Sequence, residues 1–212
     1  LVLYGPPGSG KSTVLNIVEK LFEGYCGTFD SKALGSSSNA FALEAYKSNP
    51  LIAIQHDGDL SHIEDNTRLN SLVSHETMMV NEKFRSAYAN QFKCFLFLGT
   101  NKPVKITDAK SGLIRRLIDV NPSGEKIPAK KYLDLVGKVD FERGGIACHC
   151  KEVDQKTKRL DDDYIPTRMM GASNDFYNFM LDSYFIFKKE NGVYLKRACA
   201  IYNEYNTAAN VP

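Results

Sequence analysis

The chain has 212 residues and a formal net charge of +2 at pH 7, with 43% hydrophobic and 25% charged residues. This length can bury a full core and suits one α/β domain with an appendage, whereas so balanced a charge does not by itself indicate nucleic-acid binding. Five cysteines give no paired framework, which argues against a disulfide scaffold and indicates a reducing, intracellular setting. No apolar run approaches the length of a membrane span, so we expect a cytoplasmic protein without a membrane partner.

The ends of the sequence and a change in composition predict how the chain is divided. The sequence lacks an initiator Met, opens directly on an apolar strand and stops at Pro212 without a closing element, so we interpret it as a fragment of a longer protein. The composition changes after Pro122. We predict a core over residues 1–122, a helical segment with a linker over 123–192, and the start of a further unit over 193–212.

A glycine-rich loop between a strand and a helix is the strongest feature of the sequence. Residues 1–4 are apolar, as in a buried strand, and from Lys11 onward apolar residues recur at helical spacing. Between them the stretch GPPGSGKS matches the pattern G-x-x-x-x-G-K-[ST] at every fixed position. In such a loop the backbone N–H groups and the helix N-terminus hold the β-phosphate, the lysine reaches the β- and γ-phosphates, and the hydroxyl binds Mg²⁺.

The loop therefore predicts a nucleoside-triphosphate site. Its binding residues are Gly5, Pro6, Pro7, Gly8, Ser9, Gly10, Lys11, Ser12 and Thr13. Among them Lys11 would stabilise phosphate charge and Ser12 would hold the metal. A chance turn rich in glycine and serine is the alternative, and the flanking strand and helix argue against it.

A second apolar strand, over residues 51–54, runs into a polar cluster that contains two acids. An apolar strand that ends in acidic residues is the pattern that holds Mg²⁺ through a carboxylate in nucleotide hydrolases. We favour Asp57 for the metal and Asp59 for polarising the attacking water, and the reverse assignment stays open. The alternative is that residues 57–59 form an ordinary turn.

A third buried strand, over residues 94–98, ends in the stretch GTNKP. If this strand lies beside the second one, Asn101 would sit next to the two acids. An amide there can hydrogen-bond both the γ-phosphate and the attacking water. The alternative is that residues 101–103 form a turn chosen for its backbone.

Two adjacent arginines, Arg115 and Arg116, lie inside an apolar stretch that leads into a fourth strand. Guanidinium groups in such surroundings are costly unless they are paired. One explanation is an arginine finger that reaches the γ-phosphate of a neighbouring subunit, which can be worth about 10³–10⁵ in rate. The other is a structural salt bridge to Asp108 or Asp119, which one of the two arginines would make.

The remaining segments predict helices and one projection. Residues 78–92 are rich in polar and aromatic residues, which indicates a strand, a projecting hairpin or loop, and a return. Helices are expected over residues 39–46, 63–74, 130–139, 146–153 and 173–187, the last of them well buried. Apolar runs linked by helical patterns predict an α/β fold with a largely parallel sheet flanked by helices, plus a C-terminal helical appendage.

The order of GPPGSGKS, an acid-ended strand, GTNKP and IRRLIDV resembles the superfamily 3 helicases. It is most similar to their phage and plasmid primase-helicase branch, which includes the poxvirus-type enzymes. The similarity has specific motifs over residues 1–122 and continues more loosely to the end, where it implies the opening of a winged-helix module. It implies an AAA+-like P-loop NTPase core, in which Gly10, Lys11 and Ser12 bind the phosphates and Mg²⁺. It also implies an acidic motif at Asp57 and Asp59, a sensor residue at Asn101, and an arginine finger at Arg115 or Arg116.

The resemblance also implies a DNA-contacting hairpin, and the segment 78–92 occupies its place. Lys83 and Arg85 would neutralise backbone phosphates, and Phe84 and Tyr88 would stack on bases. The alternative is a solvated loop whose aromatic side chains fold back onto the sheet. One departure from the family is that Gly58 separates two acids that are usually adjacent.

These observations predict the ATPase core of a ring-forming replicative helicase, the C-terminal half of a primase-helicase. We expect ATP and Mg²⁺ as ligands, single-stranded DNA as partner, a homo-hexamer in the full-length protein, an upstream primase domain, and the bacterial host cytoplasm if a phage encodes it. One alternative is a small-molecule P-loop kinase, which would leave Asn101 unexplained. Another is an ATP switch that controls assembly of a replication initiator without translocating.

Overall fold

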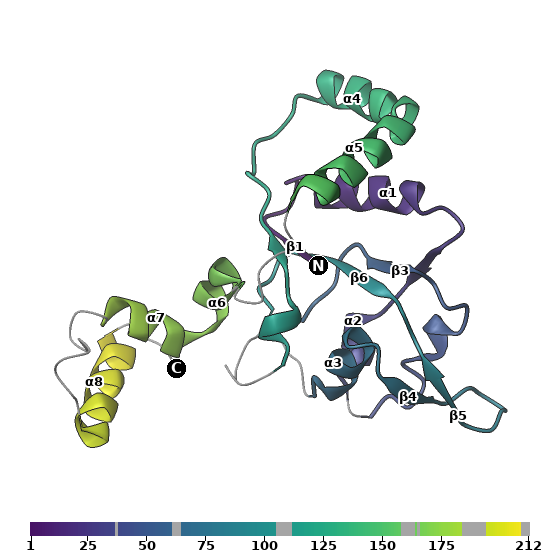
Figure 1. The fold of residues 1–212 in the computed structure, drawn as a ribbon. Coiled ribbons are helices and arrows are strands. Elements are labelled where there is room, and N and C mark those ends of the chain that lie inside the picture. Colours follow the sequence, from purple (N-terminus) through teal and green to yellow (C-terminus); the bar gives the residue numbers. More distant parts are fainter. Residues whose placement is uncertain are drawn as a thin grey trace.

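The computed structural model describes residues 1–36, 38–60, 65–104, 112–157, 164, 166–183 and 194–208. Its centre is a five-stranded sheet with the order β2-β3-β6-β1-β7, in which every pairing is parallel (Figure 1). The strands are β1 (Val2–Tyr4), β2 (Cys26–Thr28), β3 (Ile52–Gln55), β6 (Phe95–Thr100) and β7 (Asp119–Val120). The predicted α/β fold with a parallel sheet is confirmed.

Alternate residues of the strands face opposite layers of helices, because successive side chains of a strand point to opposite faces. The helices concerned are α1 (Lys11–Leu21) on one face, and α2 (Ser31–Leu34) and α3 (Thr67–Val73) on the other. Leu3 and Ile54 pack with Leu15 of α1, which is fully buried. Val2 and Ala53 belong instead to the larger core cluster that includes the apolar residues of α2 and α3. The result is a three-layer α/β/α core.

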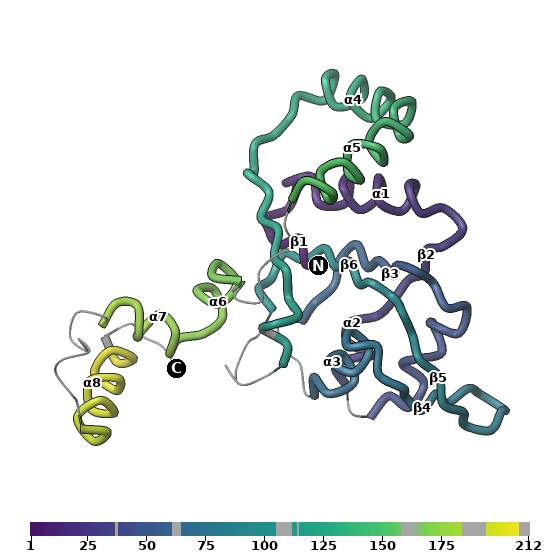
Figure 2. Tube along the Cα trace, viewed as in Figure 1, coloured from purple at the N-terminus to yellow at the C-terminus, as the bar shows by residue number. Residues whose placement is uncertain are grey.

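The predicted projection over residues 78–92 is present as an antiparallel hairpin of β4 (Thr77–Val80) and β5 (Tyr88–Gln91). Its tip extends beyond the rest of the core (Figure 2). Its base is anchored, because Phe92 is buried and its ring lies 5.7 Å from that of Tyr46.

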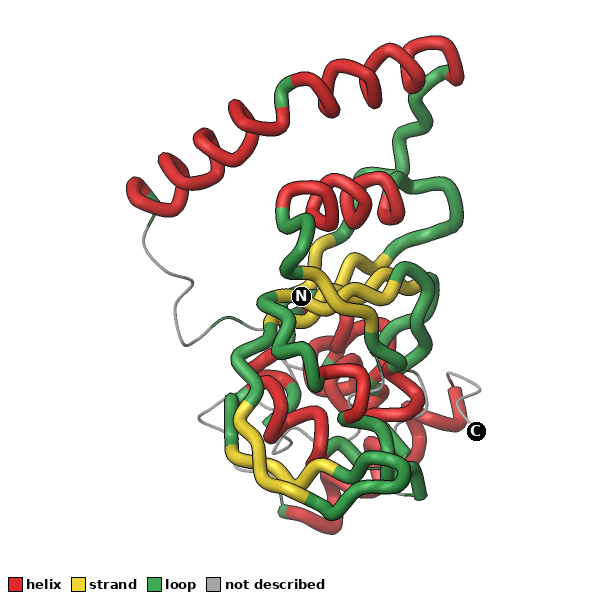
Figure 3. Tube along the Cα trace, turned by 90° about the vertical axis from the view of Figure 1, so that its right-hand side faces the viewer, coloured by secondary structure: helices red, strands yellow, loops and turns green. Residues whose placement is uncertain are grey.

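The chain beyond β7 forms two groups of helices. The first, α4 (Ala129–Phe141) and α5 (Arg143–Lys156), makes an arm beyond α1 (Figure 3). The second consists of α6 (Thr167–Ser173), α7 (Asp175–Asp182) and α8 (Leu195–Ala208). Met169 and Met170 of α6 join the main core cluster. No helix in the described ranges is both long and apolar enough to cross a membrane.

Three expectations about individual elements need correction. Residues 39–46 form turns and a short 3₁₀ helix, η1 (Glu44–Tyr46), rather than a full helix. The helix expected over 173–187 is present as α7, which begins after its cap Asn174 and ends at Asp182, and residues 184–187 lie outside the described residues. Phe179 is buried but Phe176 is 56% exposed, so the described part of this helix is only partly buried. The helix expected from residue 63 begins at Thr67 among the described residues, and residues 61–64 lie outside them.

Candidate functional site

The glycine-rich loop connects β1 to α1 and is shaped by two glycines with positive φ angles. Gly8 has φ 78° and Gly10 has φ 85°. Residues with a Cβ adopt this left-handed conformation only at a cost, whereas glycine adopts it readily. Gly10 is also the N-cap of α1, so the first backbone N–H groups of this helix open into the loop. This is the local geometry that favours an anion.

Lys11 is the buried centre of the loop, with 8% of its surface exposed. Its Nζ donates to the carbonyl oxygens of Gly5 at 2.8 Å and Pro6 at 2.9 Å, and to Oδ1 of Asn101 at 2.7 Å. Desolvation lowers the pKa of Lys11, and the nearby charge of Asp57 partly opposes this shift. The lysine therefore joins the loop after β1 to the residue after β6.

The ends of β3 and β6 touch through two glycines. The two strands pair in parallel, and the Gly58 N–H donates to the Gly99 oxygen at 2.8 Å. A Cβ added at Gly58 would lie 2.2 Å from Leu98 Cδ1, and one added at Gly99 would lie 2.4 Å from the His56 oxygen. Gly58, the departure from the usual pair of adjacent acids, is thus required by the close approach of these strands.

The two candidate acids have different surroundings. Asp59 accepts from Lys102 Nζ at 2.8 Å, and its side chain is only 23% exposed. Asp57 is exposed, has no ion pair with a described residue, and acts electrostatically on Lys11. Both line an open cleft of about 460 Å³ together with Asn101 and Lys102. Asp57 and the Ser12 hydroxyl are the oxygen donors that could hold Mg²⁺ here.

The structure separates the two arginines by their contacts. Arg116 Nε donates to Ser74 Oγ at 2.8 Å, and its Nη1 donates to the Gly112 oxygen at 2.7 Å. Arg115 is exposed and has no hydrogen bond or ion pair with any described residue. The salt bridge expected at Asp119 is not formed, because that carboxylate accepts from Tyr164 and Asn121. Asp108, the other expected partner, lies outside the described residues.

The arginines lie near the amino ends of the strands, whereas the glycine-rich loop lies at the carboxyl ends. They belong to the 3₁₀ helix η2 (Ile114–Arg116), which comes immediately before β7. Strand β7 runs parallel to β1, and Val2 N–H donates to the Ile118 oxygen. Therefore η2 is near the amino end of β1, whereas the loop follows its carboxyl end. Arg115 does not join the loop, the acids and Asn101 within one chain.

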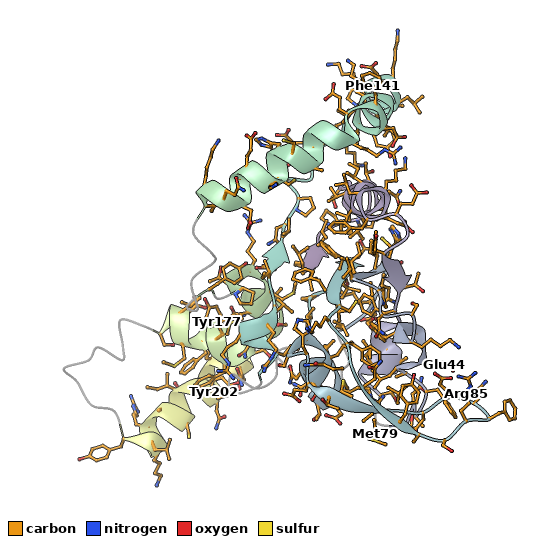
Figure 4. All side chains as sticks on the ribbon, turned by 45° about the vertical axis from the view of Figure 1, so that its right-hand side comes forward. Glu44, Met79, Arg85, Phe141, Tyr177 and Tyr202 are labelled. Atoms are coloured by element: carbon orange, nitrogen blue, oxygen red, sulfur yellow. The ribbon has the colours of Figure 1, made fainter. Side chains whose placement is uncertain are left out.

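The hairpin tip presents an aromatic ring between two cations. Phe84 is fully exposed and has a φ of 62°, so its side chain does not fold back onto the sheet. Lys83 is exposed, and Arg85 lies 3.5 Å from the buried carboxylate of Glu82 (Figure 4). Tyr88 is held at the base of the tip, because its hydroxyl donates to Glu82 at 2.8 Å.

The family model described as "Family of unknown function (DUF5906)" matches residues 3–116, which is more than half of the chain. The chain belongs to this family. A search of curated proteins found no match.

Two solved structures of the NrS-1 C-terminal region are similar to the chain. An apo structure has a TM-score of 0.55 and 16% identity, and the alignment covers 97% of this chain and 53% of that one. An A-form apo structure has a TM-score of 0.47 and 20% identity, with coverage of 65% and 33%. The chain thus spans about half, or less, of the length of these structures. The first similarity supports a shared fold.

Sequence reasoning missed two contributors to the site. Lys102 lies within the GTNKP stretch, but its ion pair with Asp59 depends on how β3 and β6 are paired. Tyr132 hydrogen-bonds Thr13 at 3.0 Å across 119 positions of sequence, which no local signal indicates.

We predict that Gly58→Ala destabilises the protein by about 1–3 kcal/mol, because the added methyl group overpacks the contact with Leu98. Gly137→Ala is the matched control, since Gly137 lies in α4 with no atom near its Cβ position and should gain about 0.5–1 kcal/mol. Denaturant unfolding measures both. Equal stability of Gly58→Ala and the parent chain would contradict the proposed close approach.

Proposed function

We propose that the chain is the ATPase motor core of a phage-type, ring-forming replicative helicase that hydrolyses ATP at subunit interfaces and moves on single-stranded DNA. The C-terminal region of NrS-1 shares the fold of the chain, with a TM-score of 0.55. The observation that carries the proposal is the hydrogen bond between Lys11 Nζ and Asn101 Oδ1, made while Asp57 acts on the same lysine. It brings a phosphate-binding loop, an acid and an amide together at the carboxyl ends of neighbouring strands.

The residues present fit an ATP–Mg²⁺ complex. The loop glycines and the start of α1 offer N–H groups to phosphates, and Lys11 offers a buried positive charge. Ser12 and Asp57 supply the oxygen ligands for Mg²⁺, which would neutralise charge that develops on the phosphates. In hydrolysis a water oxygen attacks the γ-phosphorus, and the bond to the ADP oxygen breaks.

Asp59 and Asn101 are suited to position that water. Asn101 Oδ1 lies 2.7 Å from Nζ of Lys11, the residue that would contact the γ-phosphate. The Asn101 amide would therefore be near both the γ-phosphate and the attacking water. Lys102 Nζ lies 2.8 Å from Asp59 Oδ2 at the edge of the same cleft. A small-molecule kinase would leave the position of this amide unexplained, and we therefore favour hydrolysis over transfer to an acceptor.

Arg115 would complete the site of a neighbouring subunit. Its position beyond the amino end of β1 keeps it away from its own loop, and it has no partner among the described residues. In a ring of head-to-tail subunits, the surface that carries Arg115 would lie against the glycine-rich loop of the neighbouring subunit. Arg116 would have a structural role instead, which its hydrogen bonds to Ser74 and Gly112 support.

The hairpin would contact single-stranded DNA. Phe84 offers a free aromatic face for base stacking, which tolerates any base, and Lys83 offers a cation for the phosphate backbone. Six subunits and an upstream primase domain belong to the same proposal through the superfamily 3 resemblance.

The first test is ATP hydrolysis by the chain with and without single-stranded DNA. We expect stimulation by DNA, and we expect Lys11→Ala to reduce both rates to background because it removes the charge that contacts the phosphates. Phosphate release measures the rates. Hydrolysis that is indifferent to DNA would contradict the translocase, and Lys11→Ala with full activity would contradict the site.

Arg115→Ala should leave ATP binding intact but lower hydrolysis by about 10³–10⁵-fold, as expected for loss of a finger. Mixing Arg115→Ala with Lys11→Ala tests whether the finger acts between subunits. In a random equimolar ring, about a quarter of interfaces would pair an intact loop with an intact Arg115, so activity should return. No recovery would place the arginine in its own subunit's site. Arg116→Ala should instead lower stability by about 1–3 kcal/mol.

Phe84→Ala should weaken binding of single-stranded DNA about tenfold, because a stacked base is lost. Phe141→Ala is the control, since Phe141 is also highly exposed but lies at the end of α4 (Figure 4). Lys83→Gln should reduce the salt dependence of binding by about one phosphate contact, and Lys151→Gln on α5 should not. Fluorescence anisotropy at several salt concentrations measures both effects. Equal losses from Phe84→Ala and Phe141→Ala would argue against the hairpin.

A further inference from the structure

Helices α1 and α4 lie side by side and run in the same direction. The hydroxyls of Thr13 and Tyr132 are hydrogen-bonded at 3.0 Å near the start of both helices. Seven residues further along α1, Lys20 Nζ donates to Asp140 at 2.6 Å. The sequence offset is 119 in the first pair (132 − 13) and 120 in the second (140 − 20), so the two helices stay in register over about 10 Å.

The faces between these two polar contacts do not close on each other. A cleft of about 750 Å³ lies between the helices, and its walls include Ile17 of α1 and Leu135 and Val136 of α4. No residue of α4 is buried, although Tyr132, Leu135, Val136 and Val139 recur at the spacing of one helix face. An apolar face pinned at both ends over an open cleft of this size is suited to a small-molecule ligand.

The cleft begins where the phosphate-binding loop ends. Thr13, in its wall, directly follows Ser12 of the loop. The chain that leads from β7 to α4 crosses the loop, because Cβ atoms at Gly5 and Gly8 would lie 3.3 Å from Pro122 and 4.0 Å from Lys126. A triphosphate held by the loop therefore has the cleft beside it.

We propose that this cleft binds the nucleoside half of the bound nucleoside triphosphate, with the base stacked on Tyr132. The proposal rests on the proposed function and adds a base-binding residue to it. A nucleobase needs an aromatic or apolar face and polar groups at its edge. Tyr132 is 39% exposed and so has an accessible ring, Ile17 and Val136 give apolar walls, and Asn16 and Glu19 give polar edges.

The hydrogen bond between Tyr132 and Thr13 also connects helix α4 to the end of the phosphate-binding loop. It connects α4 to the residue beside the metal-binding hydroxyl of Ser12, so a base that rests on Tyr132 also holds the α4–α5 arm against the core. The exposed ion pair between Lys20 and Asp140 contributes little by itself to holding α4 against α1, because both groups are solvated. Bound nucleotide would then be the main group that fills the space between the helices.

The test compares ATP with inorganic tripolyphosphate, which carries the phosphates but no nucleoside. Isothermal titration calorimetry would measure both ligands on the 212-residue chain with Mg²⁺. We expect Tyr132→Ala to weaken ATP binding about tenfold or more while tripolyphosphate binding stays unchanged. Tyr132→Phe should bind ATP nearly as well as the parent because it keeps the ring. Leu133→Ala is the control, since Leu133 is 72% exposed and does not line the cleft.

A second variant tests the opposite effect without removing the aromatic ring. Val136→Trp would place a larger side chain in the wall of the cleft and should weaken ATP binding by obstructing the base, while sparing tripolyphosphate. If neither Tyr132→Ala nor Val136→Trp changes ATP binding, or if both ligands weaken equally, the base lies elsewhere and this inference is overturned, although the phosphate site survives. If the parent chain binds neither ligand, the proposed function itself fails.

Discussion

The ammonium group of Lys11 is the interaction on which the candidate site depends. It is almost fully buried, and its three shortest hydrogen bonds all go to neutral oxygen atoms, two from the loop backbone and one from Asn101. Removing an ammonium group from water is expensive without a counter-charge, and the lowered pKa of Lys11 expresses that cost. A bound phosphate would supply the missing negative charge. The loop is therefore suited to bind an anion.

The parallel sheet explains why segments so distant in sequence meet at this lysine. Strands β1, β6 and β3 are neighbours, so the loop, Asn101 and the acids all emerge at one edge, where ligands bind in open parallel sheets. Gly58 and Gly99 then bring two of these segments into backbone contact. An added methyl group at either position would separate them. The spacing of the two acids is thus a consequence of strand packing.

The parts of this structure that could be predicted are those with a local physical signal. The loop has a fixed motif, and β3 and β6 are apolar runs because both of their faces are covered. Strand β2 is only Cys-Gly-Thr, so it has no apolar run and owes its conformation to pairing with β3. The different contacts of Arg115 and Arg116 depend in part on Ser74, which lies 42 positions from Arg116 and which the sequence does not reveal as its neighbour. The contact of Tyr132 with Thr13 likewise exists only after α4 has docked.

Strand β6 connects the hairpin to the candidate nucleotide site at Asn101 through one segment of backbone. The hairpin returns through β5 and the buried Phe92, and the chain then enters β6, which ends one residue before Asn101. Six strand residues span about 20 Å, and β6 pairs with β3 over residues 95–98 and with β1 over residues 98–100. A change in the position of Asn101 on loss of the γ-phosphate would therefore reach the hairpin base along a single segment of backbone.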